Sequence, residues 1–210
     1  MNADIDIKKI RNIVFDLGNV LVELYEKATY DAFAKLGFAP FLNAGKHPEV
    51  FELMHRLGLG LVTPEQFYEQ ARQLTGLSAS DDDLRSAANA MLVDIPQTKK
   101  EALLRLRSEG HRVFLLSNTN DIHWEYCAEK LFPYDGHSAA DFFDDIFLSQ
   151  RMHLEKPNAA IYEEVSRRAS LSAADTLFID DRADNCAAAQ ASVGWHVFQN
   201  KGLNDWLQLL

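Results

Sequence analysis

Side chains suited to phosphate chemistry stand at the ends of three apolar segments that lie far apart in this chain of 210 residues. Asp16 follows the first segment, Ser117 and Asn118 follow the second, and Asp180 and Asp181 follow the third. Short runs rich in β-branched and aromatic residues are typical of buried strands in a parallel sheet. Ligands bind at the carboxyl ends of such strands. We therefore expect Asp16, Ser117 and Asp181 to meet in one crevice.

Lys156, in the segment Glu155-Lys156-Pro157, adds a cation to this set. A carboxylate such as Asp16 can attack a phosphorus centre and form an aspartyl-phosphate. Because the phosphate group is itself an anion, the attack needs positive charge close by. Lys156 can stabilise the charge-rich transition state, and Mg²⁺, which prefers oxygen ligands, can bridge a carboxylate and a phosphate oxygen. The set is the outline of a phosphoryl-transfer centre.

Four short motifs carry a resemblance to a known family. They are Phe15–Leu21 (Phe-Asp-Leu-Gly-Asn-Val-Leu), Leu116–Thr119 (Leu-Ser-Asn-Thr), Lys156-Pro157 and Phe178–Asp181 (Phe-Ile-Asp-Asp). In this order they resemble the motifs of the haloacid dehalogenase-like (HAD) hydrolase superfamily, and the resemblance spans most of the chain. Within the superfamily, the residues of these motifs are similar to those of the subgroup that contains the α-glucose-1-phosphate phosphatases and the phosphatase domain of soluble epoxide hydrolase.

The resemblance implies a Mg²⁺-dependent phosphatase that hydrolyses a small phosphomonoester, with a sugar phosphate as the expected substrate. It implies an aspartyl-phosphate intermediate, with Asp16 and Lys156 as the catalytic residues. The implied phosphate-binding residues are Ser117, Asn118 and Lys156, and the implied metal ligands are Asp16, the backbone carbonyl of Gly18, and Asp181.

The acidic cluster at the end of the third segment is expected to divide its roles. Adjacent residues on a strand point in opposite directions, so Asp180 and Asp181 cannot do the same job. By resemblance, Asp181 is the metal ligand, whereas Asp180 supports the site from behind or orients Lys156. Asn185 is expected to hydrogen-bond a metal-bound water, and Asp184 is expected to be a helix N-cap.

One residue departs from the superfamily pattern. Most phosphatases of the superfamily have a second Asp two residues after the nucleophile, which protonates the leaving group and later activates water. Gly18 stands at that position. A positioned general acid or base contributes roughly 10² to 10⁴ in rate. Phosphatases with Asp-Leu-Gly occur in the resembled subgroup, so activity remains the expectation, and the residue that would replace the acid is not identified by the sequence.

Two other functions stay open. A 2-haloacid dehalogenase would also use Asp16 and would also lack the second Asp, but it needs no metal. The pair Asp180 and Asp181 favours a cation over that alternative. The second alternative is a non-catalytic, phosphate-binding regulatory protein that kept the fold.

Composition restricts the partners. The net charge of −10 disfavours duplex nucleic acid and anionic membranes, so we expect a small phosphorylated metabolite as the partner of a monomer or homodimer. Cys127 and Cys186 are too few for a disulfide framework and are expected to be reduced and buried. Residues 1–9 are polar without a signal-peptide apolar segment, and no apolar run approaches a membrane span. These features favour the cytoplasm.

Residues 23–94 have a helical pattern without a strong strand. Helices are expected near 25–36, 48–57, 64–74 and 81–91, and the third has Thr63 as N-cap, Pro64 at its first position and Gln66 in the capping-box position. Four amphipathic helices inserted after the first strand predict a small bundle over the crevice.

From residue 95 on, strands alternate with helices, which indicates βαβ units and a parallel sheet. The fold class expected is α/β, a Rossmann-like parallel sheet flanked by helices, with a small inserted helical-bundle cap. Residues 1–22 and 95–210 would form the catalytic core and residues 23–94 the cap. The expected strands are 12–15, 112–116, 145–148, 176–179 and 195–198, and the expected helices are 98–108, 121–130, 158–168, 184–191 and 203–210.

Overall fold

Five parallel strands form the centre of the computed structural model, which describes residues 5–210. They are β1 (Asn12–Phe15), β2 (Arg112–Ser117), β3 (Asp145–Leu148), β4 (Thr176–Asp180) and β5 (His196–Gln199). Their order in the sheet is β3-β2-β1-β4-β5, so the connections run outward in both directions from β1. The expected α/β fold with a Rossmann-like parallel sheet is confirmed.

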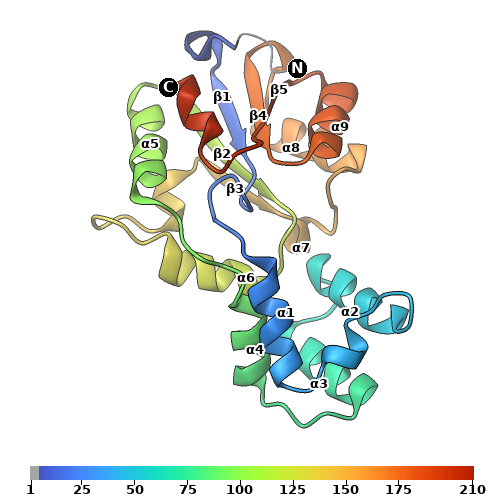
Figure 1. Ribbon diagram of the computed structural model, residues 1–210. Helices are drawn as coiled ribbons and strands as arrows, with labels where there is room; N and C mark the ends of the chain where they lie inside the picture. The colour runs from blue at the N-terminus through green and yellow to red at the C-terminus, as the bar shows by residue number, and fades with distance from the viewer. Residues whose placement is uncertain (1–4) are drawn as a thin grey trace.

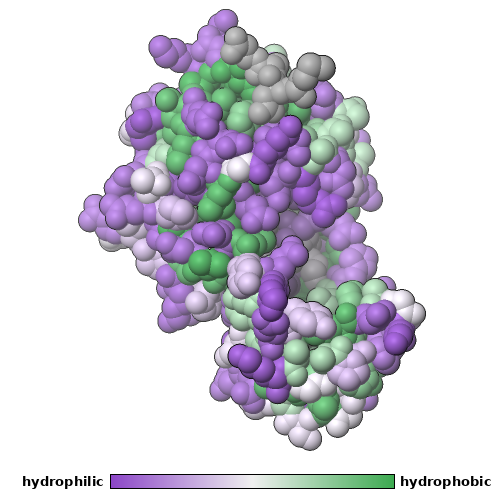
Figure 2. Space-filling model, in the orientation of Figure 1, coloured by the Kyte–Doolittle hydropathy of each residue, from purple (hydrophilic) through white to green (hydrophobic). Residues whose placement is uncertain are grey.

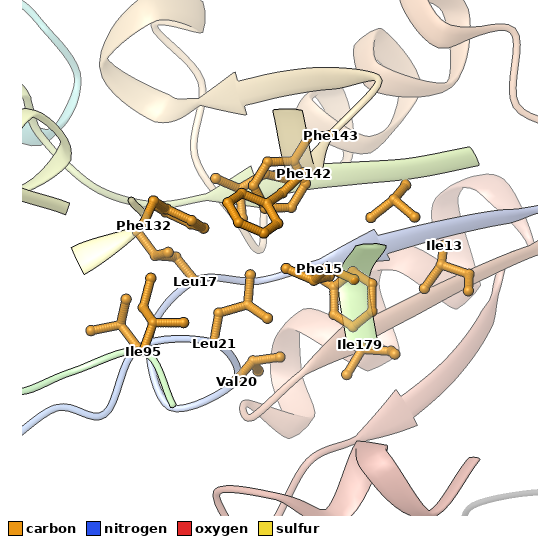
Figure 3. Close-up of a cluster of buried hydrophobic side chains, with 14 of the residues drawn as sticks. Ile13, Phe15, Leu17, Val20, Leu21, Ile95, Phe132, Phe142, Phe143 and Ile179 are labelled. Atoms are coloured by element: carbon orange, nitrogen blue, oxygen red, sulfur yellow. The ribbon is translucent and has the colours of Figure 1, made fainter. Parts of the chain in front are cut away.

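Helices cover both faces of this sheet (Figure 1). On one face lie α5 (Gln97–Ser108) and α6 (Asp121–Tyr126), and on the other α8 (Ala159–Ala169) and α9 (Ala183–Val193). Since successive strand residues point to opposite faces, Phe15 packs in the first layer, shown in Figure 3, and Val14 packs in the second. A short helix, α7 (Ser149–Met152), follows β3.

The remaining helices form a separate lobe. They are α1 (Glu26–Lys35), α2 (Pro48–Gly58), α3 (Pro64–Thr75) and α4 (Asp81–Asn89), and they lie beyond the end of β1, below the sheet in Figure 1. Their apolar faces share a core of their own, which includes Leu53, Phe67 and Leu84. The predicted capping box of α3 is present: Gln66 N–H donates to Thr63 Oγ1 at 3.3 Å, and Thr63 N–H donates to Gln66 Oε1 at 3.0 Å.

Three sequence-based expectations are corrected. Asp184 is not the N-cap of α9; Arg182 holds that position, and its guanidinium binds the Asp184 carboxylate at 2.6 Å within the first turn. The helix expected over 121–130 becomes a π-helical turn at Cys127–Leu131, where Phe132 N–H reaches Cys127 O at 2.8 Å. The helix expected over 203–210 is a 3₁₀ segment, Asp205–Leu209.

Further 3₁₀ segments are Ile7–Lys9, Ala39–Phe41, Ala139–Phe142 and Ala173–Asp175. Cys127 and Cys186 are both buried and unbridged, as expected. Among residues 5–210, no helix combines the length and the apolar character that crossing a membrane requires.

Candidate active site

The carboxyl ends of the three central strands bring the predicted residues together. Asp16 directly follows β1, Ser117 ends β2 and Asp180 ends β4. The register pairs Phe15 with Leu115 on one side and with Ile179 on the other. Because β1 is the central strand, Asp16 lies between the ends of its two neighbours. Its backbone N–H donates to Ile179 O at 2.9 Å, which holds the residue against β4.

Lys156 reaches the same point from the loop before α8. Its Nζ donates to Asp16 Oδ1 at 2.7 Å, to Asp180 Oδ2 at 2.7 Å and to the backbone carbonyl of Leu116 at 2.9 Å. Only 1% of its side chain is exposed. Burial by itself lowers the pKa of Lys156, but the two carboxylates outweigh it and raise that pKa above its usual value. The ammonium is therefore held in its charged form beside Asp16.

Asp180 is fully buried and its oxygens are occupied. Oδ2 accepts from Lys156, and Oδ1 accepts from the backbone N–H of Arg182 at 2.8 Å. The side-chain amide of Asn185 donates to both oxygens, at 3.0 and 3.1 Å. Asp180 is thus placed to orient Lys156, and Asn185 contacts Asp180 through its amide nitrogen while its buried Oδ1 has no hydrogen-bond partner within the described part of the chain.

Three carboxylates converge at the end of the sheet. One oxygen from each of Asp16, Asp180 and Asp181 lies within 4.8 Å of the others. Burial raises the pKa of Asp16 to about 7, against the lowering effect of Lys156, and the charge of Asp180 adds to the rise. Burial likewise raises the pKa of Asp181. Such crowding of oxygen donors is the arrangement that a hard cation stabilises.

Gly18 lies in the loop that follows Asp16. A Cβ added to Gly18 would meet only the side chain of Leu24, at 2.8 Å from Cδ1, and the residue has no positive φ. The backbone therefore does not require glycine there, and the nearest obstacle is the end of a flexible side chain. The loop forms an isolated bridge between Gly18 and Val22.

The side-chain amide of Asn118 is occupied by the loop that carries Lys156. Its Nδ2 donates to Lys156 O at 2.8 Å, and its Oδ1 accepts from Lys156 N–H at 2.9 Å. Asn118 therefore fixes the loop that delivers Lys156, and the backbone N–H is what it can offer to a phosphate. Ser117 is 2% exposed at the end of β2.

Sequence reasoning assigned no role to Asn19. It adopts a positive φ of 54°, which Asn tolerates better than most residues. Its Nδ2 donates to Asp181 Oδ2 at 3.2 Å, and its carbonyl accepts from Asn200 Nδ2 at 2.8 Å. The pair Gly18-Asn19 is a common turn signal, but nothing local indicates that the amide turns toward Asp181.

The sequence did not indicate a role for Lys99 either. Its side chain is fully buried, and Nζ donates to the carbonyls of Val20 and Leu21 at 2.5 and 3.3 Å. Burial lowers the pKa of Lys99 to about 8. Lys99, a residue of α5, therefore holds the loop that follows Asp16 in place. Its position in the sequence is that of an ordinary lysine on a helix surface.

A cavity of about 350 Å³ opens beside these residues, between the sheet and the lobe of α1–α4. Two histidines connect the lobe with the core at its edge. His55 Nε2 lies 2.9 Å from Glu155 Oε1, and His123 Nε2 lies 3.1 Å from the carbonyl of Ala88. The cavity is lined by Leu17, Gly18, Val22, Leu24, His55, Gly58, Met91, Leu92, Ser117, Asn118, Thr119, Asn120, His123, Ser149 and Glu155.

Comparison with known sequences points to one family. The model of the haloacid dehalogenase-like hydrolases matches residues 10–192. D-ribitol-5-phosphate phosphatase of Bacteroides thetaiotaomicron is 28% identical over 201 residues, 96% of this chain and 97% of the relative. The sesquiterpene phosphatase of Aspergillus oryzae is 31% identical over 143 residues, 66% of this chain and 68% of the relative.

Solved structures agree. A HAD family enzyme from Bacteroides thetaiotaomicron superposes with a TM-score of 0.89 at 36% identity, covering 95% of this chain and 98% of that one. A structure of that enzyme in complex with magnesium and inorganic phosphate gives 0.87 at 36% identity, with 96% and 99% covered. An L-2-haloacid dehalogenase from Xanthobacter autotrophicus gives 0.55 at 16% identity, with 90% and 77% covered, and shares the fold. The four motifs, the fold and the matched residues together show that this chain belongs to the haloacid dehalogenase-like hydrolase family.

Proposed function

We propose that this hydrolase is a phosphatase that cleaves a small phosphomonoester through an aspartyl-phosphate on Asp16. The observation that carries the proposal is the position of the buried Lys156, 2.7 Å from Asp16, because their chain neighbours Glu155 and Leu17 line the cavity together with Ser117. This arrangement offers a carboxylate nucleophile and a fixed positive charge to one phosphate group. The relatives named as phosphatases support the same reaction.

The reaction follows from what each residue can do. Asp16 attacks phosphorus, the bond from phosphorus to the ester oxygen breaks, and an aspartyl-phosphate forms. Water then attacks phosphorus, releasing inorganic phosphate and restoring Asp16. Lys156 balances charge on the phosphoryl oxygens in both steps, while the Ser117 hydroxyl and the Asn118 backbone N–H are proposed to hold those oxygens. With Gly18 in place of an acid, the leaving oxygen takes its proton from solvent.

The residues fit a magnesium ion. Asp16 and Asp181 offer carboxylate oxygens within 4.8 Å of each other, and the Gly18 carbonyl belongs to the same loop. Asp180 fits less well as a ligand, because Lys156, Arg182 and Asn185 already occupy its oxygens. We therefore propose Asp16, the Gly18 carbonyl and Asp181 as the ligands. Bound there, Mg²⁺ would neutralise phosphate charge, and a related enzyme has been solved with magnesium and inorganic phosphate.

The helical lobe of residues 23–94 is proposed to be a cap, since its helices and the sheet together enclose the cavity. The motifs predict a sugar phosphate as substrate, and the relative that acts on D-ribitol 5-phosphate supports that choice. Polar groups on the cavity wall, among them His55, Asn120 and Glu155, can bond hydroxyl groups. We propose that the protein acts in the cytoplasm as a monomer or a homodimer.

The test is hydrolysis of p-nitrophenyl phosphate with Mg²⁺ and with EDTA, beside halide release from 2-chloropropionate. We expect Mg²⁺-dependent phosphate release without halide release. Asp16→Asn should abolish turnover with an unchanged circular dichroism spectrum, whereas Asp82→Asn, an exposed carboxylate of α4, should leave it unchanged. Halide release would favour the dehalogenase, and neither activity would favour the regulatory alternative.

A further inference from the structure

A second cavity, of about 340 Å³, lies inside the helical lobe. All four helices α1–α4 contribute to its wall, and α6 closes it on the side of the core. The wall is mostly hydrocarbon, with Phe33, Leu53, Leu57, Phe67, Ala88 and Ile122 among its residues, and its polar residues include Glu26, Thr29 and Thr75. We call it the apolar cavity, and the cavity beside Ser117 and Gly18 the Ser117 cavity.

The size of the apolar cavity is that of a ligand site. Protein interiors leave few voids larger than a water molecule, whereas small-molecule sites measure roughly 300 to 1,000 Å³. An engineered apolar cavity of about 150 Å³ stays dry and binds benzene. The apolar cavity is about twice as large, so it has room for a hydrocarbon on the order of ten carbon atoms.

The two cavities adjoin. Met91, Asn120 and His123 line both, so these three residues form the boundary that a long substrate would have to cross. The wall of the Ser117 cavity also has apolar side chains, including Leu24 and Leu92. Tyr30 and Met54 of the apolar cavity are 50% and 46% exposed, so its outer end reaches the surface of the lobe. Figure 2 shows hydrophobic patches on this lobe.

We infer that the apolar cavity receives the hydrocarbon part of the substrate, and that the preferred substrates are phosphomonoesters of apolar aliphatic alcohols. The inference rests on the proposed phosphatase function, because the phosphate must be held beside Asp16. It places these substrates ahead of the sugar phosphates that the motifs predict. A sugar phosphate would fill only the Ser117 cavity and would leave the wall of the apolar cavity without a partner.

A series of n-alkyl phosphates tests this directly. Beyond the first few carbons, lengthening the chain changes the buried area and leaves the leaving-group chemistry the same. Below the micellar concentration, kcat/KM should rise about fourfold per methylene, the equivalent of about 0.8 kcal/mol, until the cavity is filled. D-ribitol 5-phosphate serves as the polar comparison.

A filled cavity should abolish the effect of chain length. Ala71 lines the apolar cavity on α3, and Gln73 lies on the exposed side of the same helix. Ala71→Phe should lower the ratio of the decyl to the ethyl phosphate rate at least tenfold, whereas Gln73→Phe should leave it unchanged. If Ala71→Phe does not fold, competitive inhibition of the wild type by 1-decanol, and not by 1-butanol, serves in its place.

The outcomes separate this inference from the proposed function. Hydrolysis of p-nitrophenyl phosphate with a flat response from butyl to decyl phosphate would overturn the apolar substrate and keep the phosphatase. Failure to hydrolyse any phosphate ester would overturn the phosphatase, and the inference with it. A rising chain-length series that Ala71→Phe removes would support both.

Discussion

Replacing Lys156 by Met is expected to destabilise the fold strongly in the absence of metal. Lys156 is the cation between Asp16 and Asp180, at 2.7 Å from each. Without it, two buried carboxylates whose oxygens lie no more than 4.8 Å apart face each other. At an effective dielectric constant of about 20, two charges at that distance repel by about 3.5 kcal/mol, and Asp16, whose pKa is already raised to about 7, can relieve part of this repulsion by binding a proton. Removing one partner of a buried ion pair typically costs about 3 to 5 kcal/mol, so we expect a loss in this range.

A double-mutant cycle with a second substitution, Asp180→Asn, tests whether repulsion between Asp16 and Asp180 causes this loss of stability. In Lys156→Met/Asp180→Asn the repulsion is gone, and the retained Asn oxygen can still accept from Arg182 N–H and Asn185. We expect the double variant to recover about 2 kcal/mol relative to Lys156→Met, a coupling of the size seen for residues in contact. The exposed Lys9, which pairs with Asp6 at the surface, is the control; its replacement by Met should cost less than about 0.5 kcal/mol.

Urea unfolding at pH 7.5 in EDTA, followed by circular dichroism, measures these free energies for wild type and all variants. Equal m-values are required, because a changed slope would mean that the surface exposed on unfolding had changed. The reasoning is refuted if Lys156→Met loses less than about 1 kcal/mol, or if the double variant is no more stable than Lys156→Met alone.

Three further predictions concern Lys99, two glycines of the helical lobe, and Gly18. Folding lowers the pKa of Lys99 from 10.5 to about 8. Between these pH values the unfolded chain binds more protons, so the stability of wild type relative to Lys99→Met should rise with pH, by about 3 kcal/mol in all. Urea unfolding from pH 7 to 10.5 measures this difference, and a constant value would contradict the prediction. Gly60 has a φ of +65°, and an added Cβ would lie 2.0 Å from Gln150 O, whereas Gly76 has a φ of +70° and open space. Gly76→Ala should therefore cost only about 1 to 2 kcal/mol of conformational strain, and Gly60→Ala should lower the stability measured by thermal unfolding clearly more. Equal losses of stability would show that the backbone at Gln150 moves away from the added Cβ at little cost. With no acid at position 18, the wild-type rate should fall steeply as the pKa of the leaving group rises, and Gly18→Asp should help alkyl phosphates more than p-nitrophenyl phosphate; a flat dependence in the wild type would mean that another residue already supplies the proton.

Much of the fold and of the candidate site was contained in the sequence. Short apolar segments ending in polar residues predict strands of a parallel sheet, and parallel strands present their carboxyl ends at one edge. That rule alone predicts that Asp16, Ser117 and Asp181 meet, although about 165 residues separate the first from the last. The capping box at Thr63 was equally local, since both of its hydrogen bonds join residues three positions apart. Four ordered motifs then identified the family.

Other features depended on the tertiary structure, because their partners are distant in the chain. Asn118 reads as a phosphate ligand, yet its amide binds the backbone of Lys156, 38 positions away. Asn19 turns to Asp181 across 162 positions. The apolar cavity is the clearest case: each helix of the lobe shows an ordinary amphipathic pattern, and only their packing decides whether the apolar faces meet or leave a space. Sequence patterns report which side of a helix avoids water, and they do not report the volume enclosed between four such sides.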